Sequence, residues 1–295
     1  MIQKRINKLR SKFIKYGIDG YVVPKNDEFF SEYSNKDRLR FISNFTGSAG
    51  YAVVLKKKNY LFVDGRYAIQ SRIESSNNFK ILDYFKIINT SVFKNLNLGI
   101  DPSLFTLKQI KNFFLKNNKI TLIKDNLIDK ISKKQNKKKS SFYSIDKSVV
   151  GESHQKKISR VSSFLKKNKY DYLFITAPEN VAWLLNIRGY DSPSSPIPNS
   201  NLLLTKEKHI FLIAEKNKTT KLLDEKKLKQ NQIVDPRYIL NFFDKLKKGT
   251  ILIDENTCSL YLEKVIEKKF RIRKKEDPIY ILKSIKNNIE IKNMI

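Results

Sequence analysis

The chain has 295 residues, with 59 Lys and Arg against 29 Asp and Glu, which gives a formal net charge of +30. This length predicts about two domains, and a composition that is 40% hydrophobic and 12% aromatic excludes a chain that is disordered throughout. One cysteine and two histidines exclude an internal disulfide and a Cys/His zinc motif. No apolar run reaches the roughly 18 residues of a membrane span, so we expect no membrane-crossing segment. The single cysteine favours a reducing compartment, and we expect a cytoplasmic protein.

The first half of the chain alternates helical and strand patterns. Residues 1–16 carry apolar side chains at helical spacing and predict a first helix that leads directly into a buried strand at 21–23. The next predicted strands are 51–55 and 59–63, and the lysine-rich segment between them indicates a hairpin turn. Strands at 98–101 and 119–123 follow, with a helix between them.

Residues 130–139 form the densest basic run and lie between two folded segments. The run lacks the interleaved aromatic side chains that stack on bases, so it indicates a solvated linker better than a nucleic-acid groove. We expect no specific nucleic-acid partner. The alternative predicts duplex or single-strand binding that survives physiological salt, whereas charge alone gives binding that vanishes there.

The second half repeats the first at a nearly constant offset. Asp171 lies 152 residues after Asp19, Asp254 lies 153 residues after Asp101, and Asp277 lies 152 residues after Asp125. Each set marks the same order of helix, strand, hairpin and strand. The sequence therefore predicts two copies of one α/β unit, each with a mixed sheet built around a central hairpin and flanked by helices.

Several short motifs, taken together in their order along the chain, indicate one protein family. They are Asp27-Glu28 with 31–33, the run 37–50 (DRLRFISNFTGSAG), Asp64-Gly65-Arg66-Tyr67, the run 181–191 (VAWLLNIRGYD), and the closing segment 277–291. This series resembles the two N-terminal domains of aminopeptidase P, the Xaa-Pro aminopeptidase of the creatinase-like metallopeptidase family.

The resemblance implies two tandem creatinase N-terminal domains with a ribonuclease-H-like α/β fold. On this basis we expect the first domain at 1–133, a Lys-rich linker at 134–152 and the second domain at 153–282. Residues 283–295 would begin the helix that enters a catalytic domain lying beyond this chain.

The resemblance also implies an activity for the complete enzyme: removal of the N-terminal residue that precedes proline in a peptide. The family does this with two divalent metal ions, manganese or zinc, held by two Asp, one His and two Glu of a third domain. We find no counterpart of these ligands, so we expect no catalytic residue and no metal ligand here, and a truncated chain that is inactive alone. Its role would be to shape the cleft for proline-containing peptides and to build a homodimer. The alternative is a stand-alone, non-catalytic interaction module with the same fold.

Four residues are candidate site residues. The resemblance implies that Arg66 reaches the substrate cleft, where a guanidinium can bind a carbonyl or carboxylate with paired donors. The competing interpretation pairs Arg66 with Asp64 or Asp37 to fix a turn. The acidic group Asp27, Glu28 and Glu32 would line the cleft or an interface and meet the ammonium group of a peptide, or else be solvated loop charges.

Overall fold

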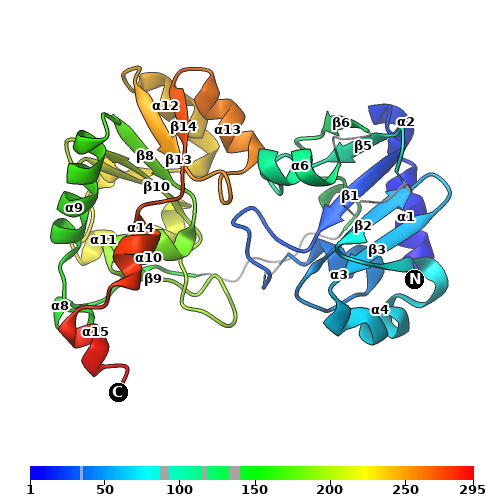
Figure 1. Cartoon of the computed structure of the whole chain (residues 1–295), viewed down its shortest axis with the longest axis horizontal. Coiled ribbons are helices and arrows are strands. Elements are labelled where there is room, and N and C mark those ends of the chain that lie inside the picture. The colour runs from blue at the N-terminus through cyan, green and yellow to red at the C-terminus, as the bar shows by residue number, and fades with distance from the viewer. Residues whose placement is uncertain (34–35, 87–92, 115–117, 133–139) are drawn as a thin grey trace. The chain divides into compact units, whose positions relative to one another are not determined.

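The computed structural model describes residues 1–33, 36–86, 93–114, 118–132 and 140–295. The chain divides into two compact units, unit 1 at 1–137 and unit 2 at 138–295 (Figure 1). Each unit is a six-stranded mixed sheet with helices packed against it. The prediction of an α/β fold with two mixed sheets is therefore confirmed.

Unit 1 has the strand order β4-β3-β2-β1-β5-β6. The central hairpin pairs β2 with β3 antiparallel, β1 joins β2 antiparallel, and the outer strands β4, β5 and β6 are added in parallel. Its strands are β1 Gly20–Pro24, β2 Gly50–Leu55, β3 Asn59–Val63, β4 Lys80–Asp83, β5 Asn97–Ile100 and β6 Lys119–Leu122. Its helices are α1 Ile2–Arg10, α2 Phe13–Tyr16, α3 Arg38–Ser43, α4 Ala68–Ser75, α6 Leu107–Phe113 and α7 Leu127–Ile131, with short 3-10 turns η1 Gly65–Tyr67 and η2 Ser76–Asn78.

Unit 2 repeats this topology strand for strand, in the order β12-β11-β10-β8-β13-β14. Every pairing has the same direction as its counterpart in unit 1. Its strands are β8 Tyr172–Ile175, β10 Asn201–Thr205, β11 Ile210–Ile213, β12 Ile233–Val234, β13 Thr250–Ile253 and β14 Arg271–Lys274, and β7 Tyr143–Ser144 pairs separately with β9 Ile187–Arg188. Its helices are α8 Lys147–Val150, α9 His154–Lys167, α10 Pro178–Leu185, α11 Lys216–Asp224, α12 Ile239–Lys245, α13 Leu260–Glu267, α14 Ile279–Ser284 and α15 Asn288–Lys292, with 3-10 turns η3 Gln230–Gln232 and η4 Pro236–Tyr238.

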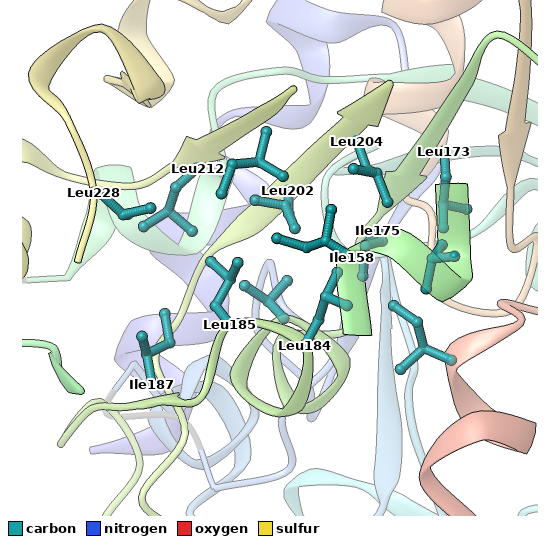
Figure 2. Packing of buried hydrophobic residues seen from close by; sticks show 14 of the residues in the cluster. Ile158, Leu173, Ile175, Leu184, Leu185, Ile187, Leu202, Leu204, Leu212 and Leu228 are labelled. Atoms are coloured by element: carbon teal, nitrogen blue, oxygen red, sulfur yellow. The ribbon is translucent and has the colours of Figure 1, made fainter. Parts of the chain in front are cut away.

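Each face of the unit 2 sheet has its own core because successive strand residues point to opposite sides. Leu173 and Ile175 of β8 pack with side chains of α9 and α10 such as Ile158 and Leu184 (Figure 2). Phe174, between them in the sequence, packs instead with side chains of α12 and α13. The result is a three-layer α/β/α unit. In unit 1, α1, α3 and α7 bury one face of the sheet in the same way.

The duplication extends to individual hydrogen bonds. The Asp19 carboxylate, just before β1, accepts from Lys56 Nζ at 2.6 Å and from the backbone N–H of Asn97 at 2.9 Å. It thereby ties the start of the central strand to the hairpin turn and to the parallel neighbour β5. The same two bonds, at 2.6 and 2.8 Å, occur in unit 2 between Asp171, Lys206 and Thr250.

A second repeated device caps a helix. Lys157 of α9 donates to the carbonyl of Trp183 at 3.0 Å and to Asn186 Oδ1 at 2.7 Å, and its ammonium lies 4.1 Å from the Trp183 ring centroid. A cation at the last carbonyls of α10 is favoured by the helix dipole. In unit 1 the same contacts, with Arg as the cation, join Arg5, Phe41 and Asn44.

The N-terminal segment corrects one expectation. We predicted a single helix over 1–16, but α1 ends at Arg10 and α2 begins at Phe13. The Ser11 hydroxyl donates to the Lys8 carbonyl at 2.9 Å and the Lys12 N–H bonds to Leu9 in a tighter turn, which interrupts the regular ladder. The break still buries Phe13 in the core.

The predicted linker, 134–152, falls partly outside the described residues, since 133–139 are not among them. Its remainder carries β7 and α8, which belong to unit 2. No helix of the described segments is long and apolar enough to cross a membrane.

Candidate functional site

Arg66 lies at the surface on a turn that its own neighbour fixes. The Asp64 carboxylate caps η1 by accepting from the Arg66 backbone N–H, and it also accepts from Arg66 Nε at 2.9 Å and Nη2 at 3.4 Å. The hydrogen bond from Arg66 holds the pKa of Asp64 below its ordinary value. The Arg66 side chain is 73% exposed, so one edge of its guanidinium is held while Nη1 lies outside this contact.

The competing interpretation, in which Arg66 pairs with an aspartate to fix a turn, therefore holds for Asp64. Asp37, the other suggested partner, instead caps α3 and pairs with Lys25 at 2.5 Å. A fixed guanidinium with free donors is suited to binding a carbonyl or carboxylate, because less side-chain entropy is lost. The substrate role of Arg66 stays a prediction.

The three acidic candidates lie in three different environments. Asp27 is buried, and its Oδ1 accepts from the backbone N–H groups of Phe29 and Ser31 at 2.9 and 3.0 Å, so it shapes the turn after β1. Burial raises the pKa of Asp27 above its ordinary value. Glu32 is exposed. The hydrogen bond to Asp64 is the main cause of the raised pKa of Arg66, and the negative charge of Glu32 is the smallest contribution. Of the acidic candidates, Asp27 is thus inside the fold and Glu32 at its surface.

Glu28 belongs to an ion-pair network that sequence reasoning missed. Its carboxylate contacts Arg38 Nη2 at 2.5 Å, and Arg38 also makes a paired contact with Asp129, with both distances 2.9 Å. The Arg38 side chain is only 3% exposed. Burial acts to lower the pKa of Arg38, but Asp129 and Glu28 outweigh it and raise the pKa. No spacing rule reveals this group, because Asp129 lies 91 residues from Arg38.

The Arg38 network lines a surface pocket of about 410 Å³. Asp101, which directly follows β5, and Asn126, which follows β6, lie in the same lining. The carboxyl ends of parallel strands are where open α/β sheets place their ligands. Glu28 is the predicted site residue that belongs to this pocket.

A second turn of the same kind occurs in unit 2. Asp235 caps η4, and its carboxylate accepts from Arg237 Nε at 2.9 Å and Nη2 at 2.8 Å, as Asp64 does for Arg66. The Arg237 side chain is 78% exposed. The pattern Asp-x-Arg-Tyr, shared by residues 64–67 and 235–238, is the sequence signal from which this turn could have been predicted. This turn follows β12, the counterpart of β4, whereas the Arg66 turn follows β3, so the two are not equivalent in the duplication.

The described residues do not fit a two-metal site. Among them, no group of three or more His, Cys, Asp or Glu side chains could hold a metal ion. Glu28 and Asp129 are already paired with Arg38, and Asp27 accepts from backbone N–H groups. We derive no metal-dependent step from these residues.

Comparison with known proteins agrees with this architecture. The sequence model of the Creatinase/Prolidase N-terminal domain matches residues 5–129, and a second model with that description matches residues 132–290. A crystal structure of X-prolyl aminopeptidase from Caenorhabditis elegans, described as a cytosolic enzyme with a di-nuclear active site, has the same fold. Its TM-score is 0.85 at 23% identity, with 100% of this chain and 53% of that chain covered.

Curated relatives carry the same family name. A probable Xaa-Pro aminopeptidase P of Laccaria bicolor is 32% identical over 71% of this chain and 35% of its own length. Xaa-Pro aminopeptidase 1 of Dictyostelium discoideum is 30% identical over 99% of this chain and 50% of its own length. The chain thus spans half or less of the length of these relatives. With its two tandem Creatinase/Prolidase N-terminal domains, the chain belongs to the aminopeptidase P family and covers the N-terminal part of its members.

Proposed function

We propose that this chain is the non-catalytic N-terminal half of a Xaa-Pro aminopeptidase, which removes the N-terminal residue preceding proline. The observation that carries the proposal is the tandem pair of creatinase N-terminal domains. The two models match residues 5–129 and 132–290, so together they account for nearly the whole chain, which covers 50% of the length of the Dictyostelium discoideum relative. The bond-breaking step and its two divalent ions, manganese or zinc, then belong to the other half of the complete enzyme.

The proposed role of this half is to shape the substrate cleft and to take part in a homodimer in the cytoplasm. The fixed, exposed guanidinium of Arg66 supports a contact with peptide, because it offers donors without the cost of ordering a free side chain. The Caenorhabditis elegans enzyme with the same fold is described as cytosolic. Light scattering on the complete enzyme measures the assembly, and a monomer would contradict the dimer.

The first test compares the chain with the complete enzyme. We expect the purified 295-residue chain to leave an Xaa-Pro tripeptide intact with manganese present, and a complete protein containing the same 295 residues to cleave it. Turnover by the fragment, or none by the complete protein, would contradict the proposal. A complete protein that ends near residue 295 would instead support the stand-alone interaction module.

The second test separates a substrate contact from a structural turn. In the complete enzyme we expect Arg66→Gln to lower kcat/KM by about 10- to 100-fold, as for loss of a charge-assisted contact. Arg237→Gln is the matched control, since Arg237 sits on the same kind of turn with the same internal ion pair. Equal effects of the two variants, or no effect of Arg66→Gln, would leave Arg66 without a substrate role.

A further inference from the structure

Unit 1 contains a pocket whose charged lining is entirely basic. It has a volume of about 440 Å³ and lies where the β2–β3 turn meets α1 and η2. Arg10, Lys57, Lys58 and Lys80 contribute the charges, and side-chain amides with one tyrosine complete the lining. No Asp or Glu is among these lining residues. The site is therefore complementary to an anion.

Arg10 is held in place by neutral groups. Its Nε donates to the Leu55 carbonyl at 2.8 Å and its Nη2 donates to Asn59 Oδ1 at 2.9 Å. Asn59 is itself fixed, because its Nδ2 donates to the Asn78 carbonyl at 2.9 Å. Burial lowers the pKa of Arg10, and the hydrogen bonds that the described residues give it are to a carbonyl and an amide, not to a carboxylate. A positive charge is thus positioned in advance without a compensating negative charge.

The duplication supplies an internal comparison for this pocket. In unit 2 the place of Arg10 is taken by Ser162, whose hydroxyl donates to the Thr205 carbonyl at 3.2 Å, just as Arg10 donates to Leu55. The hairpin turn of unit 2 contains Glu207 at the position where unit 1 has a lysine. The shared framework therefore does not require the cations, although lysine is abundant in both units. Two of the four cations of the pocket, Arg10 and Lys57, are thus replaced in unit 2 by a neutral and an acidic side chain.

We propose that this pocket binds an oligophosphate group, either as a free oligophosphate or as part of a nucleotide. Four cations favour a ligand with several negative charges, and phosphate oxygens accept bonds from lysine and arginine in many directions. The side-chain amides around them add neutral donors. A carboxylate ligand would satisfy fewer of these groups.

The test is titration calorimetry of the 295-residue chain with tripolyphosphate at about 0.15 M salt, where loosely attracted ions are screened. Lys57→Gln/Lys58→Gln removes two exposed charges of the pocket, and Lys247→Gln/Lys248→Gln removes two exposed charges of unit 2 as the matched control. We expect the control to bind like the unchanged chain and the pocket variant to bind at least about tenfold more weakly. Both double variants exchange only exposed side chains, so both should fold.

Equal weakening in the two double variants, or no binding at this salt concentration, would overturn the proposal. A second titration uses adenosine triphosphate. Affinity equal to that of tripolyphosphate would mean that recognition ends at the phosphates, and higher affinity would mean that a nucleoside is also bound. Either result supports the pocket, provided that the Lys57/Lys58 variant loses it.

Discussion

At the scale of single residues, the two units differ in the side chain that accepts a hydrogen bond at the start of the helix after their last sheet strand. Asn126 Oδ1 accepts from the Ile128 N–H at the start of α7, and Asp277 Oδ1 accepts from the Ile279 N–H at the start of α14, both at 2.9 Å. Unit 1 thus uses a neutral amide where unit 2 uses a carboxyl. Burial raises the pKa of Asp277 to about 6.

This difference predicts a pH dependence of unit 2. An unfolded carboxyl ionises near 3.8 and the folded one near 6, so the stability contributed by protonated Asp277 is complete below pH 4 and is lost as the pH rises through 6. We therefore compare the free energy of unfolding of Asp277→Asn with that of the unchanged chain at each pH. This difference should shift in favour of the variant by about 2–3 kcal/mol between pH 4 and pH 7, whatever its value at pH 4. Urea unfolding followed by the fluorescence of Trp183, the single tryptophan, measures it. A pH-independent difference would refute the assignment.

Local sequence reasoning reached some of these residues and missed others. It paired Asp277 with Asp125, but the side chain with the capping role of Asp277 is Asn126, one residue further. The Arg66–Asp64 contact could be foreseen because the two residues are two positions apart. The Arg38 network could not, since its partners come together only when the sheet has formed.

At the scale of elements, an aspartate just before β1 and another just before β8 should each stabilise their own unit. Asp171→Ala removes the bonds to Lys206 and to the Thr250 N–H, and we expect it to lower the free energy of unfolding of unit 2 by about 1–3 kcal/mol. The matched change in unit 1, Asp19→Ala, should leave the Trp183 transition in place and instead speed amide exchange in β1 and β5. If both changes moved the Trp183 transition equally, the two units would not unfold separately.

The strands were predicted better than the helix ends. The hairpin strands at 51–55 and 59–63 were confirmed because apolar runs on both sides of a polar turn leave few alternatives. The break between α1 and α2 was missed because helical spacing continues through Phe13, and only the Ser11 side-chain bond decides the geometry. Periodicity gives the buried face of a helix, but not where its ladder is interrupted.

At the scale of the whole molecule, the charge of +30 predicts nonspecific attraction to polyanions. We expect the chain to bind a labelled DNA duplex at low ionic strength and to lose most of that affinity by about 0.2 M salt, because counterion release supplies the binding. Fluorescence anisotropy over a salt series measures the slope. Tight binding to one duplex sequence that persists at this salt concentration would restore the nucleic-acid interpretation.

The duplication was the part of the fold that the sequence predicted most completely. Constant offsets between motifs indicated two copies, and the two sheets have the same strand order and the same directions of pairing. What no offset could predict is how the copies diverged. Arg10 and Ser162 occupy matching places, as do Asn126 and Asp277. In each pair the backbone partner is retained while the side chain differs, so the shared framework does not fix which side chain is present.

The strand order also sets when each half can form during translation. All six strands of unit 1 lie between residues 20 and 122, and those of unit 2 lie between residues 172 and 274, so no pairing waits for the other half. Ribosomes add about 5–20 residues per second, which leaves the first sheet several seconds outside the exit tunnel before β14 is synthesised. We therefore expect the nascent chain to complete one half before it begins the other. This order would keep strands of one sheet from pairing with strands of the other.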